Sequence, residues 1–428
     1  MVAAISHRYK TGPAITFAAV PYFLPPKRSS FSSAGQSLLF ETAARGGAAP
    51  TGVTDKVNVD ANVSSRINLM RIVLISGIVF VHIPFDPANT PFNGNHGFFD
   101  WLRVFLSEAL FRVGVPCLSA ISGYLLFRGG MEGFNYTKTV RTKAQTVFLP
   151  FLIWNTLFFV AVLAILAIGI GDGYVISPYE STFRELLSQL FAAETFPANI
   201  PLYFLRDLFV CILISPILAW LVRRIPLITL SSLLLLALIP ELPLYIVIKR
   251  SILFSFTFGI YASLYKLDIK ALDRFAPLGV ALLLGASALL ATAIYATGPS
   301  MPDWVELSRN ALAIGGAAGF WMLSALLIKT PLGQRLSKTG SLSFWIFCAH
   351  YPLLVFLFMV WGKTGVDFYP LFFGGCLLVL FPLLVLTNGF VRSNAPKSYA
   401  VLTGGRTKKG PQNPSRRDIP ADFVPQRR

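Results

Sequence analysis

The chain has few charged residues for its length. Of 428 residues only 13% are Asp, Glu, Lys or Arg, whereas an ordinary soluble domain has roughly 25%. Hydrophobic residues make up 54% of the chain, which excludes a soluble globular protein and excludes disorder for most of its length. The apolar runs are continuous rather than alternating, which argues against a porin-type barrel. Composition therefore predicts an all-α polytopic membrane protein.

Cysteine and histidine are also scarce, with four of each. All four cysteines lie in apolar runs without zinc-ligand spacing, so we interpret them as small core residues and expect no disulfide framework. The histidines are dispersed, so no metal site is predicted and no permanently bound cofactor is expected. Nucleotide hydrolysis has no support, because no Gly-rich phosphate loop precedes a predicted helix.

Acidic residues are outnumbered by basic ones, 20 against 37, and much of the excess lies near the two ends of the chain. Binding to nucleic acid would explain this charge but not the apolar middle, so no nucleic-acid partner is expected. The pattern predicts three regions: a flexible basic tail over residues 1–65, a membrane domain over 66–392, and a disordered basic tail over 393–428.

Ten apolar stretches are each close to the ~20 residues that a helix needs to cross a bilayer. One set of alternate loops carries twelve Lys or Arg and the other set five, with Lys249 and Arg309 counted among the five. Basic loops stay in the cytoplasm, so the richer set and both termini are predicted there. Residues 181–195 are expected to form an interfacial helix. The predicted spans are 67–85, 104–126, 146–169, 202–222, 226–244, 250–265, 275–297, 308–328, 341–361 and 369–391.

Two ionisable residues stand out in the first span, because such residues are costly inside a membrane. Arg71 and His82 are eleven residues apart, so a helix places them on one face about 16.5 Å from each other. They are expected to address two ends of one elongated site. The alternatives are that Arg71 is a snorkelling anchor and that His82 is a buried, hydrogen-bonded histidine.

The residues after His82 read Ile-Pro-Phe-Asp, and Asp86 is a candidate to orient the imidazole and leave one ring nitrogen free as a base. An ordinary loop acid is the alternative. Glu108 and Arg112 have i,i+4 spacing in the second span, which predicts an ion pair that holds the site without acting in it.

Five blocks in order along residues 66–392 resemble acyltransferase family three, the bacterial integral-membrane O-acyltransferases that modify sugars. Tyr203 stands where the family has tryptophan, and Lys138-Thr-Val-Arg141 replaces its Arg-x-x-Arg. The blocks are Arg71 to His82, Phe111 to Tyr124 ending in Ser-Gly-Tyr, Phe148 to Trp154, Pro201 to Arg206, and Ser341 to His350.

The resemblance implies about ten spans in a bacterial cytoplasmic (inner) membrane, a cytoplasmic acyl-CoA donor, and a sugar, glycan or lipid-linked sugar as acceptor. Acetyl is the expected acyl group and succinyl the alternative. His82 is expected to be the general base, with Arg71 near the entrance for the donor. Lys138, Arg141 and Lys143 would hold the nucleotide end of the donor, unless they only mark the cytoplasmic side.

Four further residues are assigned to substrate or oxyanion contacts. Arg206 or Ser122 would donate to the oxyanion, Tyr124 belongs to the Ser-Gly-Tyr block, and His350 would contact the acceptor or take part in proton transfer. Direct transfer and a covalent acyl-His82 intermediate both stay open. Outside this family, a transporter or flippase for a glycan or its lipid-linked precursor, or a non-catalytic scaffold, would also tolerate intramembrane charges.

Overall fold

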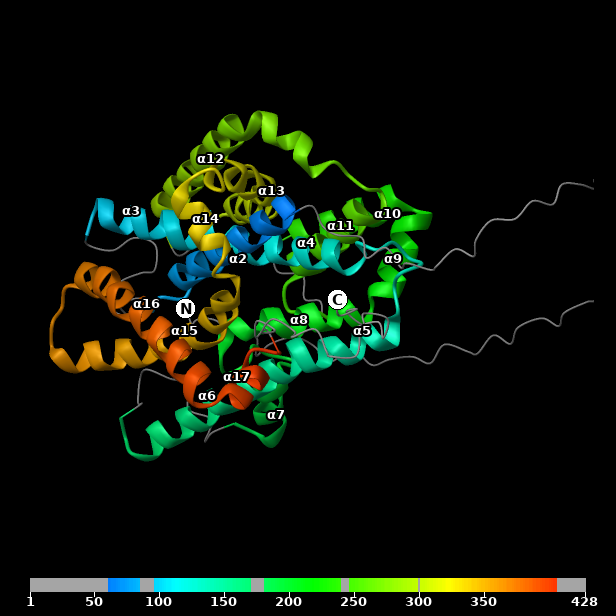
Figure 1. Cartoon of the computed structure of the whole chain (residues 1–428). Coiled ribbons are helices and arrows are strands. Elements are labelled where there is room, and N and C mark those ends of the chain that lie inside the picture. Colours follow the sequence, from blue (N-terminus) through cyan, green and yellow to red (C-terminus); the bar gives the residue numbers. More distant parts are fainter. Residues whose placement is uncertain (1–60, 85–95, 171–180, 240–245, 299–300, 406–428) are drawn as a thin grey trace, which may run out of the picture. The chain divides into compact units, whose positions relative to one another are not determined.

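A computed structural model describes residues 61–84, 96–170, 181–239, 246–298 and 301–405 (Figure 1). All of them belong to one compact unit, Asn58–Arg428. Asp86 and the prolines at 240 and 243 lie outside the described residues, as do both ends of the chain.

Every regular element in the described ranges is a helix, which confirms the all-α class. The elements are α2 (Ala61–Val81), α3 (Phe98–Val104), η1 (Phe105–Ala109), η2 (Leu110–Val113), α4 (Gly114–Leu126), α5 (Tyr136–Lys143), η3 (Ala144–Phe148), α6 (Leu149–Ala167), α7 (Phe183–Phe191), η4 (Ile200–Leu202), α8 (Tyr203–Leu213), α9 (Ser215–Arg224), α10 (Pro226–Leu238), α11 (Arg250–Leu264), η5 (Ile269–Phe275), α12 (Ala276–Thr297), α13 (Asp303–Leu327), α14 (Pro331–Ser337), α15 (Gly340–Thr364), α16 (Tyr369–Asn394) and α17 (Pro396–Leu402).

The helices are long and apolar enough for a protein that crosses a membrane several times. Within the described residues seven helical stretches pass this test, and an eighth is the pair η4/α8 and α9, bent by 61°. α10 and α11 are shorter, with 13 and 15 residues. Each of the ten predicted spans contains a helix, but the count of ten and the cytoplasmic termini remain predictions.

α2 lies at the centre of the packing, against α4, α13, α14 and α15. Its first turns are fixed by Arg66, whose side chain is only 2% exposed. The guanidinium donates to both carboxylate oxygens of Asp273 at 2.7 and 2.9 Å and to the Ser324 hydroxyl at 3.0 Å. It also stacks 3.7 Å from the centre of the Trp321 ring. These contacts tie α2 to η5 and α13, and so set the position of the helix that leads to His82.

α4 and α11 approach each other very closely, and two glycines make this possible. A Cβ atom at Gly123 would lie 2.0 Å from the Phe256 carbonyl oxygen, and one at Gly259 would lie 2.1 Å from that of Ala120. Small residues that let two backbones meet are typical of packed membrane helices.

The second span consists of consecutive helical pieces rather than one regular helix. α3 passes into the π-helical turn η1, then into the 3₁₀ turn η2, and then into α4. A π turn adds a residue and rotates the side chains around it, and such turns are frequent at functional sites. Here η1 contains Glu108 and η2 contains Arg112, so the irregular backbone coincides with the charged part of the span.

Two predictions about shorter segments have different outcomes. The helix expected in 181–195 is confirmed as α7, whose first turn carries a capping box between Thr182 and Glu185. The disorder expected from 393 is wrong for its first part, because α16 ends at Asn394 and α17 follows. Tyr399 is 2% exposed and stacks on Trp345, so one aromatic anchor overrides the polar composition of the segment.

Candidate active site

Two histidines from the first and ninth predicted spans meet inside the helix bundle. His82 lies directly after the end of α2 and His350 lies near the middle of α15. Their ring centroids are 5.4 Å apart in an edge-to-face arrangement. His82 is half-buried and His350 is fully buried, so the pair has one accessible member and one enclosed member.

Both imidazoles are oriented by backbone carbonyls. The Nδ1 atom of His82 is 2.9 Å from the Ile78 oxygen, and Nδ1 of His350 is 2.9 Å from the oxygens of Ile346 and Phe347. A carbonyl only accepts hydrogen bonds, so Nδ1 must carry the proton in each ring. In the neutral ring Nε2 is then left with its lone pair. The Nε2 atom of His350 is buried and has no partner in the described part of the chain.

The backbone after His82 is anchored from α16. The Tyr369 hydroxyl donates to the Pro84 carbonyl at 2.8 Å, while the His82 amide donates to Val79 in the last turn of α2. The sequence suggested that Asp86 fixes the tautomer of His82. In the structure the Ile78 carbonyl binds Nδ1 of His82 and can do so.

A buried asparagine pair supports α15 next to His350. Pro352 lies inside α15 and has no N–H, so the helix provides no i+4 donor for the Cys348 carbonyl. The Asn199 side chain donates to that carbonyl at 3.2 Å. Asn155 accepts from the Asn199 amide at 2.9 Å and donates to the carbonyls of residues 189 and 190. The carbonyl that loses its i+4 donor, two residues before His350, is thus bound by a side chain from another segment.

The predicted ion pair between Glu108 and Arg112 is confirmed, with oxygen–nitrogen distances of 2.7 and 2.8 Å. It is part of a larger arrangement, because Arg309 of α13 also reaches Glu108 at 3.4 Å and Glu306 at 3.2 Å. Arg309, which the sequence placed with a loop, therefore lies in α13 and is 17% exposed in its side chain.

A second buried carboxylate fixes the start of α11. Asp207 of α8 is fully buried and accepts from the backbone amides of Ile248 at 3.1 Å and Lys249 at 2.9 Å. Arg206 donates to Asp207 at 3.0 Å and to the Ile246 carbonyl at 2.6 Å. Asp207 therefore holds the position of Lys249, whose ammonium lies 5.7 Å from the centre of the Phe196 ring.

Arg112 links these groups electrostatically. Its charge acts on His82, on Tyr203 of α8 and on Lys249, which come from three different parts of the fold. Burial among the surrounding protein, with the charges of Arg112 and Arg309, lowers the pKa of Lys249 to about 8. The Lys249 side chain is nevertheless exposed.

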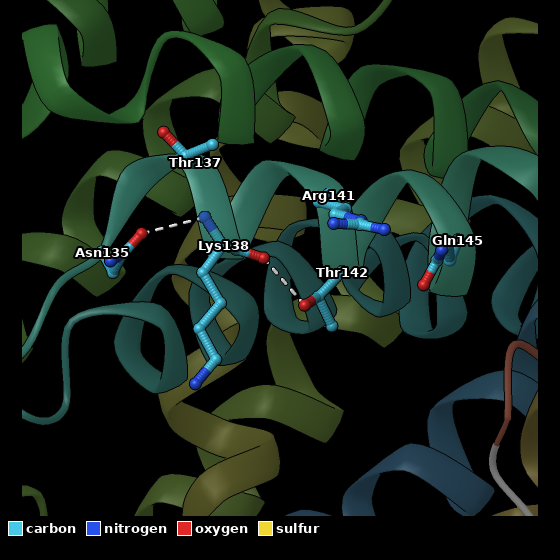
Figure 2. A pocket seen from close by; sticks show the side chains of 6 residues that line it. All are labelled: Asn135, Thr137, Lys138, Arg141, Thr142 and Gln145. Atoms are coloured by element: carbon cyan, nitrogen blue, oxygen red, sulfur yellow. Dashed lines mark hydrogen bonds between the residues drawn. The ribbon is translucent and has the colours of Figure 1, made fainter.

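A separate shallow pocket of about 600 Å³ lies at the other end of the bundle, where α5 begins (Figure 2). Asn135 caps α5 by accepting from the Lys138 amide at 2.9 Å. The i, i+3, i+4, i+7 spacing from Lys138 to Gln145 places the lining side chains on one helix face. The lining residues are Asn135, Thr137, Lys138, Arg141, Thr142 and Gln145.

A family model described as an acyltransferase domain matches residues 64–387 of the chain. The succinoglycan biosynthesis protein ExoH of Rhizobium meliloti (strain 1021) is 54% identical over 349 residues, which cover 82% of this chain and 94% of that protein. No solved structure matches the chain significantly. The chain belongs to acyltransferase family three. It is a multi-pass membrane O-acyltransferase.

The structure brings together some of the residues that the family resemblance singled out and separates others. His82 and His350 meet, and Lys138 and Arg141 line one pocket. Lys143 is half-buried on the same helix and is not among the lining residues. Arg71 is half-buried on α2, and no described residue gives it a hydrogen bond or ion pair.

Ser122, Tyr124 and Arg206 fit their expected roles less well. Gly114, at the start of α4, packs on Ile78 near His82, and Ser122 is eight residues further, about 12 Å along the helix. The Ser122 hydroxyl donates to the Leu118 carbonyl, so its proton is engaged. Tyr124 lies beyond it in the same direction.

Arg206 holds the Asp207 and Ile246 backbone network. Asn199, Lys249 and Arg309 were not singled out from the sequence, where the one weak signal is that they are polar residues next to apolar spans.

Proposed function

We propose that this protein transfers an acyl group from acyl-CoA to a hydroxyl of an exported or cell-surface polysaccharide, with His82 as general base. The observation that carries the proposal is the His82–His350 pair, in which both Nδ1 protons are bound by carbonyls and both Nε2 atoms are left as acceptors. A neutral imidazole with a free nitrogen suits proton abstraction near neutral pH.

In the proposed step, Nε2 of His82 accepts the proton of the acceptor hydroxyl while its oxygen attacks the thioester carbonyl. The new ester C–O bond forms, the C–S bond breaks, and the CoA sulfur leaves as a thiol after it takes the proton from His82. His350 contacts the acceptor through its unpartnered Nε2.

Charge develops on the carbonyl oxygen in this step, and Arg112 is placed to stabilise it. Its charge reaches His82, and its Nε atom is buried and has no partner among the described residues. We therefore prefer Arg112 for the oxyanion, because Nη1 of Arg206 is engaged with Asp207 and the Ile246 carbonyl and the Ser122 hydroxyl is engaged with the Leu118 carbonyl.

The donor's nucleotide fits the pocket of Lys138 and Arg141. Both side chains are exposed on one helix face, and charge-assisted hydrogen bonds to phosphate are the strong contacts such residues make. We place this end of the bundle in the cytoplasm, where acyl-CoA is found, and the protein in the bacterial inner membrane; the positive-inside pattern supports the cytoplasmic side. Arg71 lies on α2 eleven residues before His82, about 16.5 Å from it along the helix, and is proposed to meet the donor there.

The class of acceptor is inferred from the relative ExoH. Its printed name places it in succinoglycan biosynthesis, which supports an extracellular polysaccharide as the acceptor for this chain. Acetyl and succinyl both remain candidates for the acyl group.

The test compares O-acyl groups on surface polysaccharide, by NMR and mass spectrometry, in a gene-deleted strain carrying wild type or His82→Ala at equal membrane abundance. Wild type is expected to restore an ester that the deletion lacks, and His82→Ala is expected not to. His96→Ala is the matched control, because His96 packs on Phe99 and Phe368 and has no ring contact with either histidine of the pair in the described residues. Full restoration by His82→Ala contradicts the base assignment, and loss of the polysaccharide itself would indicate transport.

A further inference from the structure

We propose that Lys249, with Arg112 and Arg309, forms a binding subsite for an anionic group, a carboxylate or phosphate, carried by a substrate that reaches His82. The inference rests on the proposed function, because it takes the ligand to be a substrate of that site. Arg112, Lys249 and Arg309 are called the basic cluster below.

The charges of the basic cluster do not balance. Three cations face two carboxylates: Glu108, which Arg112 and Arg309 share, and Glu306, which pairs with Arg309. Among the described residues Glu306 is the one carboxylate whose charge acts on Lys249, and it is already engaged with Arg309. The cluster therefore carries a net positive charge, Lys249 is its exposed member, and an anionic ligand would supply the missing counter-charge.

The backbone at Lys249 is held in position by Asp207 and Arg206. Two buried backbone contacts to Asp207 fix the turn before α11, and the carbonyl of Ile246 is fixed by Arg206. The ammonium lies over Phe196 and has no ion pair with a described residue. Asp207 and Arg206 therefore fix the backbone from which the Lys249 side chain extends, which preorganises this end of the proposed site.

The position of the cluster relates it to the reaction. The charge of Arg112 acts on both His82 and Lys249, which relates the ammonium to the base. A group bound at Lys249 would be part of a molecule whose other end reaches His82. Two sources provide such a group: a carboxylate at the far end of a dicarboxylic acyl chain on the donor, or an acidic group on the acceptor.

The experiment uses full-length protein in lipid nanodiscs and compares wild type with Lys249→Met. In the donor arm, dissociation constants are measured for succinyl-CoA and acetyl-CoA. In the acceptor arm, thermal denaturation is followed with glucuronate and with glucose. Lys363→Met is the matched control, because Lys363 is exposed in the last turn of α15.

If the donor carries the anion, wild type is expected to bind succinyl-CoA at least tenfold more tightly than acetyl-CoA, and Lys249→Met to bind both equally. If the acceptor carries it, both proteins bind the two donors equally, and glucuronate but not glucose raises the midpoint of wild type only. Lys249→Arg is expected to keep the preference. Glu306→Gln, which removes a competing carboxylate, is expected to increase it, and this variant decides the question where Lys249→Met does not fold.

Preferences that are the same in wild type, Lys249→Met and Glu306→Gln overturn the inference. Such a result does not contradict the proposed function, provided that His82→Ala still abolishes acylation in cells. If wild type binds neither acyl-CoA, the proposed function fails instead, and the glucuronate comparison alone decides the anion subsite.

Discussion

His82 and His350 are separated by most of the membrane domain in sequence, yet their rings meet at 5.4 Å, and each ring donates from Nδ1 to a carbonyl of its own helix. This arrangement gives the two residues equivalent tautomers but different access, since His350 is fully buried. The accessible ring is the one suited to abstract a proton, and the enclosed ring is suited to orient the hydroxyl.

The pair predicts unequal effects of substitution. His82→Gln is expected to lower the acylation rate by about 10²–10⁴-fold, which is the usual contribution of a general base. His350→Gln keeps a hydrogen-bonding group and is expected to cost about tenfold, mainly in the KM for the acceptor. The measurement is the rate of ester formation on polysaccharide in membranes, and equal losses in the two variants would contradict the division of roles.

Asn199 is predicted to act as a positioning residue for His350 through the Cys348 carbonyl, whose i+4 donor is absent at Pro352. Asn199→Ala is expected to lower kcat about tenfold, because the break in α15 loses its brace next to His350. Asn310→Ala is the control, since Asn310 also donates to a backbone carbonyl but lies elsewhere, at Leu238.

A second substitution separates positioning from general destabilisation. Pro352→Ala restores a backbone N–H at the break, so it is expected to recover much of the activity that Asn199→Ala loses. A double variant no more active than Asn199→Ala alone would show that Asn199 acts in some other way.

The sequence predicts the fold class and the catalytic pair better than it predicts the electrostatics around them. Long apolar runs identify helices one by one, and an isolated histidine in such a run is conspicuous because its burial needs a reason. Both properties are local. The all-α class, the α7 helix and the Glu108–Arg112 pair are accordingly confirmed.

The residues that the sequence missed depend on contacts between distant segments. Lys249 and Arg309 were counted with loop charges because they lie at the ends of apolar runs. Only the packing of α13 and α11 near η1 and η2 brings them to Glu108 and Arg112. No sequence pattern around Asn199 indicates its role, because that role depends on Pro352 in α15. Local patterns do not report such pairings.

The pocket at α5 predicts a change in donor binding without a change in chemistry. Arg141→Gln removes one of two exposed cations from the pocket, and is expected to raise the KM for acyl-CoA about three- to tenfold with kcat unchanged. Added salt is expected to affect wild type more than the variant, because these exposed charges are screened. Arg128→Gln is the control, and a fall in kcat alone for Arg141→Gln would contradict a binding role.

Lys249 predicts a pH dependence that differs from that of His82. Its pKa is lowered to about 8 by burial and by the charges of Arg112 and Arg309 on η2 and α13, with Arg250 of its own helix acting in the same direction and Glu306 against them. The ammonium is charged below this pKa and neutral above it. The preference for an anionic substrate is therefore expected below pH 8 and is expected to disappear as the pH rises through it.

The measurement is the ratio of dissociation constants for succinyl-CoA and acetyl-CoA, or of midpoint shifts with glucuronate and glucose, between pH 6.5 and 9.5. Lys249→Arg should keep the preference over the whole range, because a guanidinium stays protonated there. A preference that wild type retains at pH 9.5 would mean that Arg112 and Arg309 bind the anion without Lys249. A preference that Lys249→Arg also loses near pH 8 would assign the titration to another group.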